Sequence, residues 1–265
     1  MKQSIITAMA LVLVLGLIGA AVAGITGTKH DLRTANNSVT IRADTASNAI
    51  EICAFCHTPH GAETTGNGPL WNKNTSGLTS FNVYSGSPTM DTTPATLPTG
   101  VSLVCLSCHD GSLAIDSMRN APGSGGFNPS TTSPYTMLGT TNDLMPAGIT
   151  RIGATDGGSN TGQLQDDHPV SMTYAGNIGG SGAKDAKMRN AVQVSGGAQY
   201  VVPGNDQTTP SSGTDIDGYV KLYDNKVECA SCHNPHGTEV SGANLPLFLR
   251  RTNENSTLCL TCHIK

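Results

Sequence analysis

Apolar residues are concentrated at the start of the chain and thinly spread after it. Residues 5–22 form a nearly continuous apolar run rich in Leu, Val and Ala, and the run follows Lys2. It leads into Ala21-Val22-Ala23, a small-residue sequence typical of signal-peptide cleavage, so we expect the mature chain to begin near Gly24. The alternative is an uncleaved membrane anchor, but the run is near the lower length limit for spanning a bilayer. We therefore predict a signal peptide at residues 1–23 and an exported protein.

Beyond this run, the hydrophobic pattern predicts only short elements. Short helices are expected at 47–55, 103–119 and 185–192, and short strands at 199–202 and 219–223. Residues 120–163 are rich in Gly, Ser, Thr, Asn and Pro, so they predict a flexible linker or surface loops.

Composition reinforces this picture of a loop-rich chain. Aromatic residues make up 4% of the chain, and 31 of its 265 residues are Gly. Such a chain buries little apolar surface and, by composition alone, tends towards disorder. The predicted fold class is therefore mostly irregular coil with short helices and few short strands.

The cysteines follow one pattern, C-x-x-C-H, which is the attachment signature of c-type haem. Two thiols three residues apart can each bond to one haem vinyl group, and the following histidine can ligate the iron from one face. The signature occurs four times and uses all eight cysteines: Cys53–Cys56–His57, Cys105–Cys108–His109, Cys229–Cys232–His233 and Cys259–Cys262–His263. Paired zinc sites are the alternative, although zinc ribbons do not need a histidine after every second cysteine.

The motifs belong to an internal repeat. C-A-F-C-H-T-P-H-G, starting at Cys53, matches C-A-S-C-H-N-P-H-G, starting at Cys229, and both continue to a Pro-Leu-aromatic sequence with one residue inserted in the second copy. Each copy then runs into a C-L-x-C-H motif, and each has one histidine upstream, His30 or His168. We predict a first dihaem module at 24–119 and a second at 164–265.

The histidine count fits two axial histidines for each iron. His57, His109, His233 and His263 are the ligands given by the motifs, and the four others are His30, His60, His168 and His236. Methionine is the competing second ligand, but Met90, Met118, Met137, Met145, Met172 and Met188 follow no repeat. We therefore predict bis-histidine ligation of four haems.

The second axial ligands can be assigned only as expectations. His60 and His236 cannot readily reach the far face of their own haem, because the thioether bonds hold this backbone at the near face. They are expected to reach the second haem of their own module. His30 and His168 would then complete the first haem of each module or reach a neighbouring subunit.

Four haems would supply the core that the side chains lack. Each haem is a large, flat, apolar group around which loops can pack, so we expect the chain to wrap around a chain of haems. Without haem, the protein is expected to be unfolded or nearly so.

Charge excludes some partners. The formal net charge is −4 and no basic run is present, so nucleic acid and anionic membranes are poor partner candidates. Charged residues are only 13% of the chain, which suits a surface built to pack against copies of itself.

Saturated iron indicates electron transfer. An iron with two axial imidazoles has no open site for a substrate, so its chemistry is outer-sphere electron transfer. No C-x-x-C-K motif, as found in some multihaem enzymes, is present. We predict an electron carrier that is not an enzyme; an enzyme with a five-coordinate haem is the alternative.

The doubled C-x-x-C-H-x-P-H-G, the paired C-L-x-C-H, the Asp-His-Pro-Val sequence at 167–170 and the signal peptide resemble the outer-surface multihaem cytochromes of metal-reducing bacteria. The spacing is most similar to the OmcE-type tetrahaem subunits of extracellular nanowires. This resemblance implies a filament of stacked haems, with one axial histidine crossing a subunit boundary, for which His30 is the candidate. It also implies other cytochromes and extracellular acceptors such as metal oxides as partners. A soluble periplasmic tetrahaem shuttle is the alternative.

Overall fold

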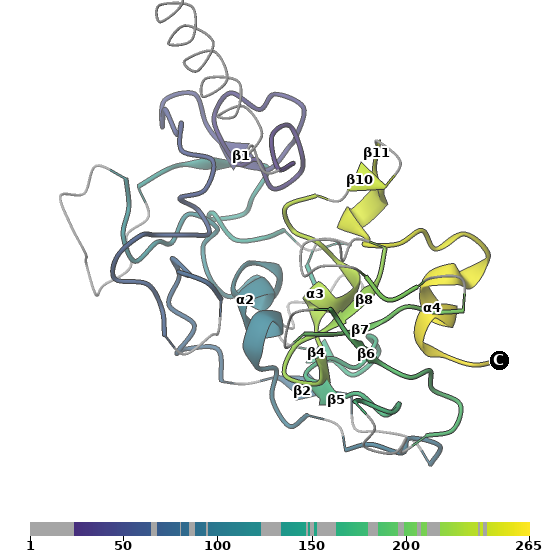
Figure 1. The fold of residues 1–265 in the computed structure, drawn as a ribbon. Helices are drawn as coiled ribbons and strands as arrows, with labels where there is room; N and C mark the ends of the chain where they lie inside the picture. Colours follow the sequence, from purple (N-terminus) through teal and green to yellow (C-terminus); the bar gives the residue numbers. More distant parts are fainter. Residues whose placement is uncertain are drawn as a thin grey trace, which may run out of the picture.

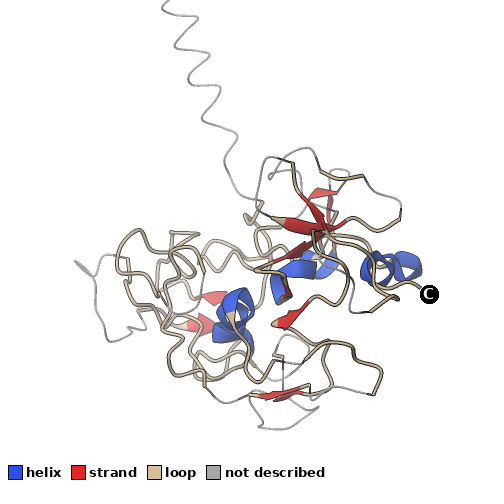
Figure 2. Cartoon of the chain, turned by 60° about the horizontal axis from the view of Figure 1, so that its bottom comes forward, coloured by secondary structure: helices blue, strands red, loops and turns tan. Residues whose placement is uncertain are grey.

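Loops and turns make up most of the chain in the computed structural model (Figures 1 and 2). The structure describes residues 24–64, 68–79, 81–84, 88–93, 95–122, 134–146, 148, 151–152, 163–179, 185–195, 199–205, 208–210, 218–237, 239–240 and 243–265. The expected signal peptide at 1–23, and residues 123–133 and 153–162 of the expected linker, lie outside the described residues.

The regular elements are all short. The helices are α2 (Gly100–His109), α3 (Cys229–Cys232) and α4 (Thr257–Cys262), with 3-10 turns η2 (Pro246–Phe248) and η3 (Glu254–Ser256). The strands are β1 (Arg42–Ala43), β2 (Asn82–Val83), β3 (Met137–Leu138), β4 (Gln163–Leu164), β5 (Met172–Thr173), β6 (Val192–Gln193), β7 (Tyr200–Val202), β8 (Val220–Leu222), β9 (Lys226–Val227), β10 (Glu239–Val240) and β11 (Ala243–Asn244). Within the described residues, no helix is long and apolar enough to cross a lipid bilayer.

Helix α2 is the longest helix described, and it is shorter than predicted. It follows Thr99, whose backbone is extended, and ends at Asp110, whose N–H bonds to the carbonyl of Leu106. Gly111 then has a φ of 73°, the left-handed conformation that commonly ends a helix. The predicted helix at 103–119 is therefore wrong after His109.

The other two predicted helices, at 47–55 and 185–192, do not form, apart from the single turn that begins at Cys53. In the 47–55 stretch, the N–H of Ser47 donates to Asp44 at 2.7 Å, and Asn48 has a φ of 48°. In the 185–192 stretch, the N–H of Lys187 donates to the Asp185 carboxylate at 2.7 Å. The Asp185 contact is an Asx turn, which competes with helix formation, and the left-handed φ of Asn48 interrupts the 47–55 stretch.

The strands at 199–202 and 219–223 are confirmed as β7 and β8. Together with β6 they form a three-stranded antiparallel sheet, in which Val201 lies opposite Val192 on one side and Lys221 on the other. Four two-stranded pairs complete the described sheet structure: β1 with β3, β2 with β4, β5 with β9, and β10 with β11. The β2–β4 pair is parallel and joins residues far apart in the sequence.

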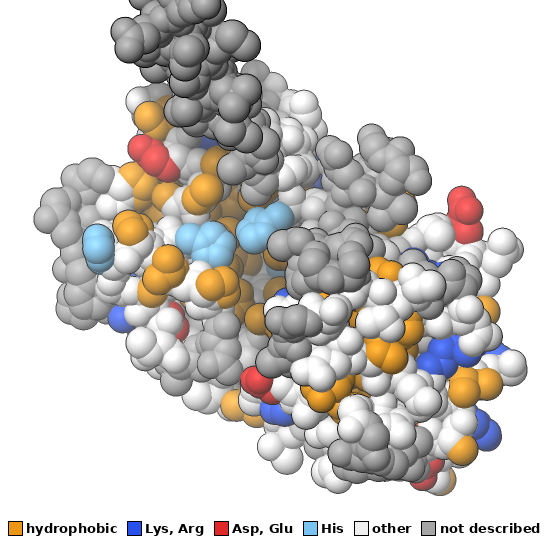
Figure 3. Space-filling view, in the orientation of Figure 1, with side chains coloured by type: hydrophobic (Ala, Val, Ile, Leu, Met, Phe, Trp, Pro, Cys, Tyr) orange, Lys and Arg blue, Asp and Glu red, His pale blue; other side chains and the backbone are white. Residues whose placement is uncertain are grey.

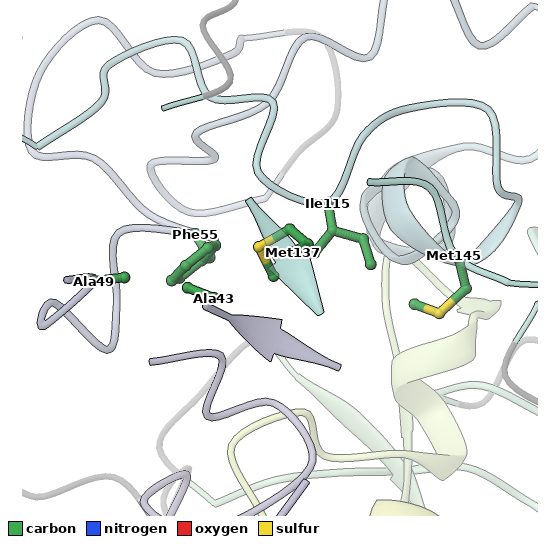
Figure 4. Packing of buried hydrophobic residues seen from close by; sticks show 6 residues of the cluster. All are labelled: Ala43, Ala49, Phe55, Ile115, Met137 and Met145. Atoms are coloured by element: carbon green, nitrogen blue, oxygen red, sulfur yellow. The ribbon is translucent and has the colours of Figure 1, made fainter. Parts of the chain in front are cut away.

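Two small apolar clusters lie in different parts of the chain. The first consists of Ala43, Ala49, Phe55, Ile115, Met137 and Met145 (Figure 4). The second consists of Tyr174, Ala191, Val202, Val220, Leu222 and Val227. The first cluster thus includes side chains from the expected linker, while the module boundaries themselves stay a prediction. Met118, Met137 and Met145 are buried, as expected of methionines that serve packing.

Candidate haem sites

Each C-x-x-C-H motif lies on a helical turn, as predicted. Helices α2, α3 and α4 carry the second, third and fourth motifs. At the first motif, the N–H of His57 donates to the carbonyl of Cys53 at 2.8 Å, which closes a single α-helical turn. This turn brings the two thiols and the histidine of a motif to one side, which is the arrangement that a haem needs.

In the first half, Pro69 and Asn72 form hydrogen bonds with the motif, and we call this set of hydrogen bonds the clasp. The imidazole Nδ1 of His57 lies 2.7 Å from the carbonyl oxygen of Pro69. The N–H of Asn72 donates to the Cys56 carbonyl at 2.9 Å, and its side-chain amide donates to the Ala54 carbonyl at 2.7 Å. These hydrogen bonds therefore hold the motif at its histidine, at its second cysteine and at Ala54, which follows the first cysteine.

The second half repeats this clasp with different side chains. His233 Nδ1 lies 2.7 Å from the Leu247 carbonyl oxygen. The N–H of Arg250 donates to the Cys232 carbonyl at 2.8 Å, and its guanidinium Nε donates to the Ala230 carbonyl at 2.9 Å. Arg250 thus takes the place that Asn72 holds in the first half.

The clasp corrects the alignment of the repeat. The sequences align Pro69 with Pro246, but the hydrogen bonds make Pro69 equivalent to Leu247 and Leu70 equivalent to Phe248. The backbone pairing agrees, because His57 pairs with Trp71 in an antiparallel bridge and His233 pairs with Leu249 in the same way. The second copy therefore contains two inserted residues before the equivalent position, not one.

Four of the eight imidazoles use Nδ1 against a backbone carbonyl. Besides His57 and His233, His30 Nδ1 lies 2.9 Å from the Pro235 oxygen and His168 Nδ1 lies 3.0 Å from the Pro169 oxygen. An Nδ1–H that donates to a carbonyl fixes the tautomer in which Nε2 has a free lone pair, as is usual in metal-ligating histidines. These imidazoles are therefore held in the form that can ligate iron.

Imidazoles also meet in pairs. The ring centres of His57 and His236 are 5.9 Å apart, and those of His30 and His109 are 6.1 Å apart. His236 thus lies beside the histidine of the first motif, while the haem that it ligates stays a prediction. His30 stacks on Phe248 at 4.3 Å within its own chain; its donation to a neighbouring subunit stays a prediction.

One histidine of each pair, His30 or His236, has a lowered pKa. Burial, and then the neighbouring imidazole charges, lower the pKa values of His30 and His236 below the ordinary value of 6.5, against a hydrogen bond to Pro235 that acts to raise that of His30. Burial and the charge on His168 likewise lower the pKa of His263. A lowered pKa favours neutral imidazole, the form that binds metal.

A cavity of about 200 Å³ opens beside the third motif. Its lining includes Cys229, Cys232, His233 and His168 together with apolar side chains from four elements: Val83 of β2, Leu106 of α2, Leu164 of β4 and Val227 of β9. Two thiols, two imidazoles and an apolar wall are the donor set and surroundings that covalent haem requires. The residues therefore fit this group.

The thiols are close to one another along the chain of motifs. Cys105 of the second motif and Cys229 of the third are hydrogen-bonded, which raises the pKa of Cys105 and lowers that of Cys229. Burial, and then the charge on Cys108, raise the pKa of Cys56 to about 12. Burial, and then the charge on Cys232, raise the pKa of Cys262 to about 12. Each motif therefore lies near the next motif in the sequence: the first near the second, the second near the third, and the third near the fourth.

The described residues offer little to the zinc alternative. A structural zinc ion needs four ligands around one point. Within the described part of the chain, which includes every cysteine and histidine, no group of three or more His, Cys, Asp or Glu side chains converges in this way.

Histidine side chains gather on one face of the molecule among apolar side chains (Figure 3). His60 is exposed, and its carbonyl accepts a hydrogen bond from the Thr58 hydroxyl at 2.9 Å. Sequence reasoning missed the clasp residues Asn72 and Arg250. The repeated Pro-Leu-aromatic sequence just before them was the available signal.

Comparison with known families agrees with the motif chemistry. A family model described as "Doubled CXXCH motif" matches residues 223–265, which contain the third and fourth motifs. These motifs indicate covalently bound haem c and the electron-transfer chemistry of multihaem c-type cytochromes. A comparison with curated proteins finds no match.

Proposed function

We propose that the protein transfers electrons through four covalently bound haems, each with two axial histidines, as a subunit of an extracellular filament. Four imidazoles support the proposal of electron transfer, because each is held by a contact between its Nδ1 and a backbone carbonyl. The carbonyls belong to Pro69, Pro235, Pro169 and Leu247. Such contacts prepare Nε2 for iron. Eight histidines for four motifs allow every iron to be saturated.

The residues would have separate roles. Cys53, Cys56, Cys105, Cys108, Cys229, Cys232, Cys259 and Cys262 would hold the haems. His57, His109, His233 and His263 would ligate iron on the attachment side, and His30, His60, His168 and His236 on the other. The bound haem supplies one-electron redox chemistry. The chain orients the imidazoles, and its apolar lining keeps water away.

The order of the motifs supports a continuous path. Cys105 lies against Cys229, and the charges of Cys108 and Cys232 act on Cys56 and Cys262 respectively. Haems attached at these places would follow one another in sequence order, so an electron could pass along the molecule in short steps.

The filament part rests on composition and resemblance. A chain with only 13% charged residues lacks the charged rim with which soluble shuttles dock. The apolar run at 5–22 supports export, and c-type haem is attached outside the cytoplasm. Copies of itself, other cytochromes and external acceptors such as metal oxides are the proposed partners.

Electron microscopy of material sheared from the cell surface tests the filament, with the haem spectrum measured on the same sample. We expect filaments with an unbroken row of haems. Monodisperse low-spin monomers in the periplasm would identify a soluble shuttle and contradict the filament. A high-spin signal in the oxidised protein would indicate a five-coordinate haem and contradict saturated ligation.

A further inference from the structure

The first two haem motifs each face an imidazole from a distant part of the chain. His57, of the first motif, faces His236, which follows the third motif. His109, of the second motif, faces His30, which lies upstream of all the motifs. These contacts join segments that the sequence repeat does not relate to each other.

The separations suit a shared metal ion. An imidazole nitrogen binds a first-row metal ion at about 2 Å, and the ring centre lies roughly 1 Å further back, so two imidazoles on opposite sides of one ion have ring centres about 6 Å apart. The observed separations are 5.9 Å and 6.1 Å. The ring planes differ by 39° and 67°, which such an ion permits because each ring can rotate about its metal–nitrogen bond.

Hydrogen bonds orient one imidazole in each pair. His57 Nδ1 is 2.7 Å from the Pro69 oxygen, and His30 Nδ1 is 2.9 Å from the Pro235 oxygen. Each ring therefore turns its Nε2 away from that carbonyl. His30 is further fixed by stacking on Phe248 with an interplanar angle of 6°.

The two distant donors belong to one structural unit. His30 binds the carbonyl of Pro235, the residue before His236. A Cβ added to Gly24 would lie 3.3 Å from the His236 carbonyl oxygen, so the chain before His30 also lies against this segment. Residues 24–30 and 234–237 can thus present both imidazoles to the first half together.

We infer an axial pairing that the repeat does not suggest: His236, from the second half, is the second ligand of the haem attached at Cys53 and Cys56, and His30 is the second ligand of the haem attached at Cys105 and Cys108. This pairing rests on the proposed bis-histidine ligation. Its consequence is that the first haem joins the two halves of the chain, and that the first half needs His236 of the second for saturated iron.

Double substitution tests the shared iron without assigning spectra to individual haems. His57→Met, His236→Met and the double variant are prepared as holo-proteins, and altered irons are counted by electron paramagnetic resonance and redox titration. Each single variant is expected to alter one haem, and the double variant the same one haem. If the His57→Met variant fails to acquire its haem, adding His236→Met to that variant should alter none of the haems that remain. The pair His109→Met and His30→Met is tested in the same way.

His57→Met combined with His60→Met is the matched control. These two histidines belong to one attachment segment, whose backbone is held at one haem face, so this double variant should alter two haems. Two altered haems in the His57/His236 variant would overturn the inferred pairing while leaving bis-histidine ligation intact. Single variants that alter no haem would instead overturn the proposed function.

A structure of the wild-type holo-protein provides a test that does not depend on the variants folding. We expect His236 Nε2 to be bonded to the iron of the haem held by Cys53 and Cys56. Bonding of His236 to the iron of any other haem would overturn the inference.

Discussion

At the scale of single residues, buried charged side chains fix loops by hydrogen bonds, in a chain that has few apolar side chains to pack. The ammonium group of Lys73 is almost fully buried, with 1% of the residue exposed. It donates to the carbonyls of Ala114, Ile115 and Ser117 at 3.2, 2.6 and 3.1 Å. One side chain thus ties together the loop that follows α2, beside the first apolar cluster.

Replacing Lys73 by Met tests this role. Met has a similar length but cannot donate, so three buried carbonyls lose a partner, and leaving buried acceptors unpaired costs about 1–3 kcal/mol. We expect the free energy of unfolding of the holo-protein to fall by about this amount, so the variant should unfold at a lower denaturant concentration. Lys187→Met, at an exposed lysine, is the control and should have little effect. Equal effects of the two changes would contradict the role of Lys73.

Glu228 is the second buried charge, located where α2 and α3 meet. Its carboxylate accepts hydrogen bonds from Ser102 and Ser171. Burial, only partly offset by these bonds, raises the pKa of Glu228 above its ordinary value of 4.5. The folded state therefore prefers the protonated form, and the contribution of this group to stability is greatest below about pH 4.5 and is lost as the pH rises through the folded-state pKa.

Glu228→Gln should remove this pH dependence. The variant keeps an acceptor for the two serines but carries no charge. Thermal unfolding of the holo-protein is expected to show little difference from wild type near pH 4 and a higher midpoint for the variant at pH 7. A variant that is less stable than wild type at pH 7 would show that the folded protein favours the charged carboxylate.

At the scale of elements, the clasp occurs at the first motif of each half. Asn72 donates to the carbonyls of Ala54 and Asn120 at 2.7 and 3.1 Å, and its own oxygen accepts from the N–H of Asn120 at 2.9 Å. The clasp thereby joins the first motif to the chain that follows the second.

Asn72→Leu should loosen this clasp. The side chain keeps its size but loses three hydrogen bonds in a buried position, which predicts a loss of about 2–3 kcal/mol in unfolding free energy. Hydrogen exchange should also become faster at His57 and Thr58. Asn74→Leu is the control, because the Asn74 side chain bonds only locally, to Ser76. No difference between the two variants would mean that the clasp does not hold the motif.

The sequence predicts the motif turns and the two strands in the sheet, because both depend on local patterns. It does not predict the end of α2 at the left-handed Gly111 or the Asx turn at Asp185, since both residues are equally compatible with an ordinary exposed position in a helix. It also misplaces the repeat by one residue, because the Pro-Leu-aromatic similarity outweighs a shift that becomes visible only through the hydrogen bonds of Asn72 and Arg250.

The partner of His236 was equally hidden from the sequence. The repeat suggests a haem of the same half, since nearby motifs are the simplest targets. The structure brings His57 to it instead, through contacts between segments about 180 residues apart. The pairing of imidazoles therefore depends on long-range packing, which the spacing of histidines along the chain does not show.

At the scale of the whole molecule, the described side chains form two apolar clusters of six residues each. Phe55 and the neighbouring Cys56 and Cys108 lie in or against the first, and Leu258 and Cys262 lie against the second. The attachment points therefore border the clusters, where bound haems would extend the apolar surface.

This arrangement predicts that the protein does not fold without haem. A chain with all attachment cysteines changed to Ser should show no cooperative unfolding transition and rapid hydrogen exchange throughout. The clusters alone bury too little apolar area to offset a conformational entropy cost of about 1–2 kcal/mol for each residue. A cooperative transition in this chain, matching that of holo-protein, would show that the side chains suffice.

The proposed function requires that four haems are attached and that every iron lies between two imidazoles. The most direct measurement combines the intact mass of the exported protein with electron paramagnetic resonance of its oxidised form. We expect a mass four haems above that calculated from the mature sequence, and only low-spin bis-histidine signals. Fewer than four haems, or a high-spin or histidine–methionine signal, would contradict it.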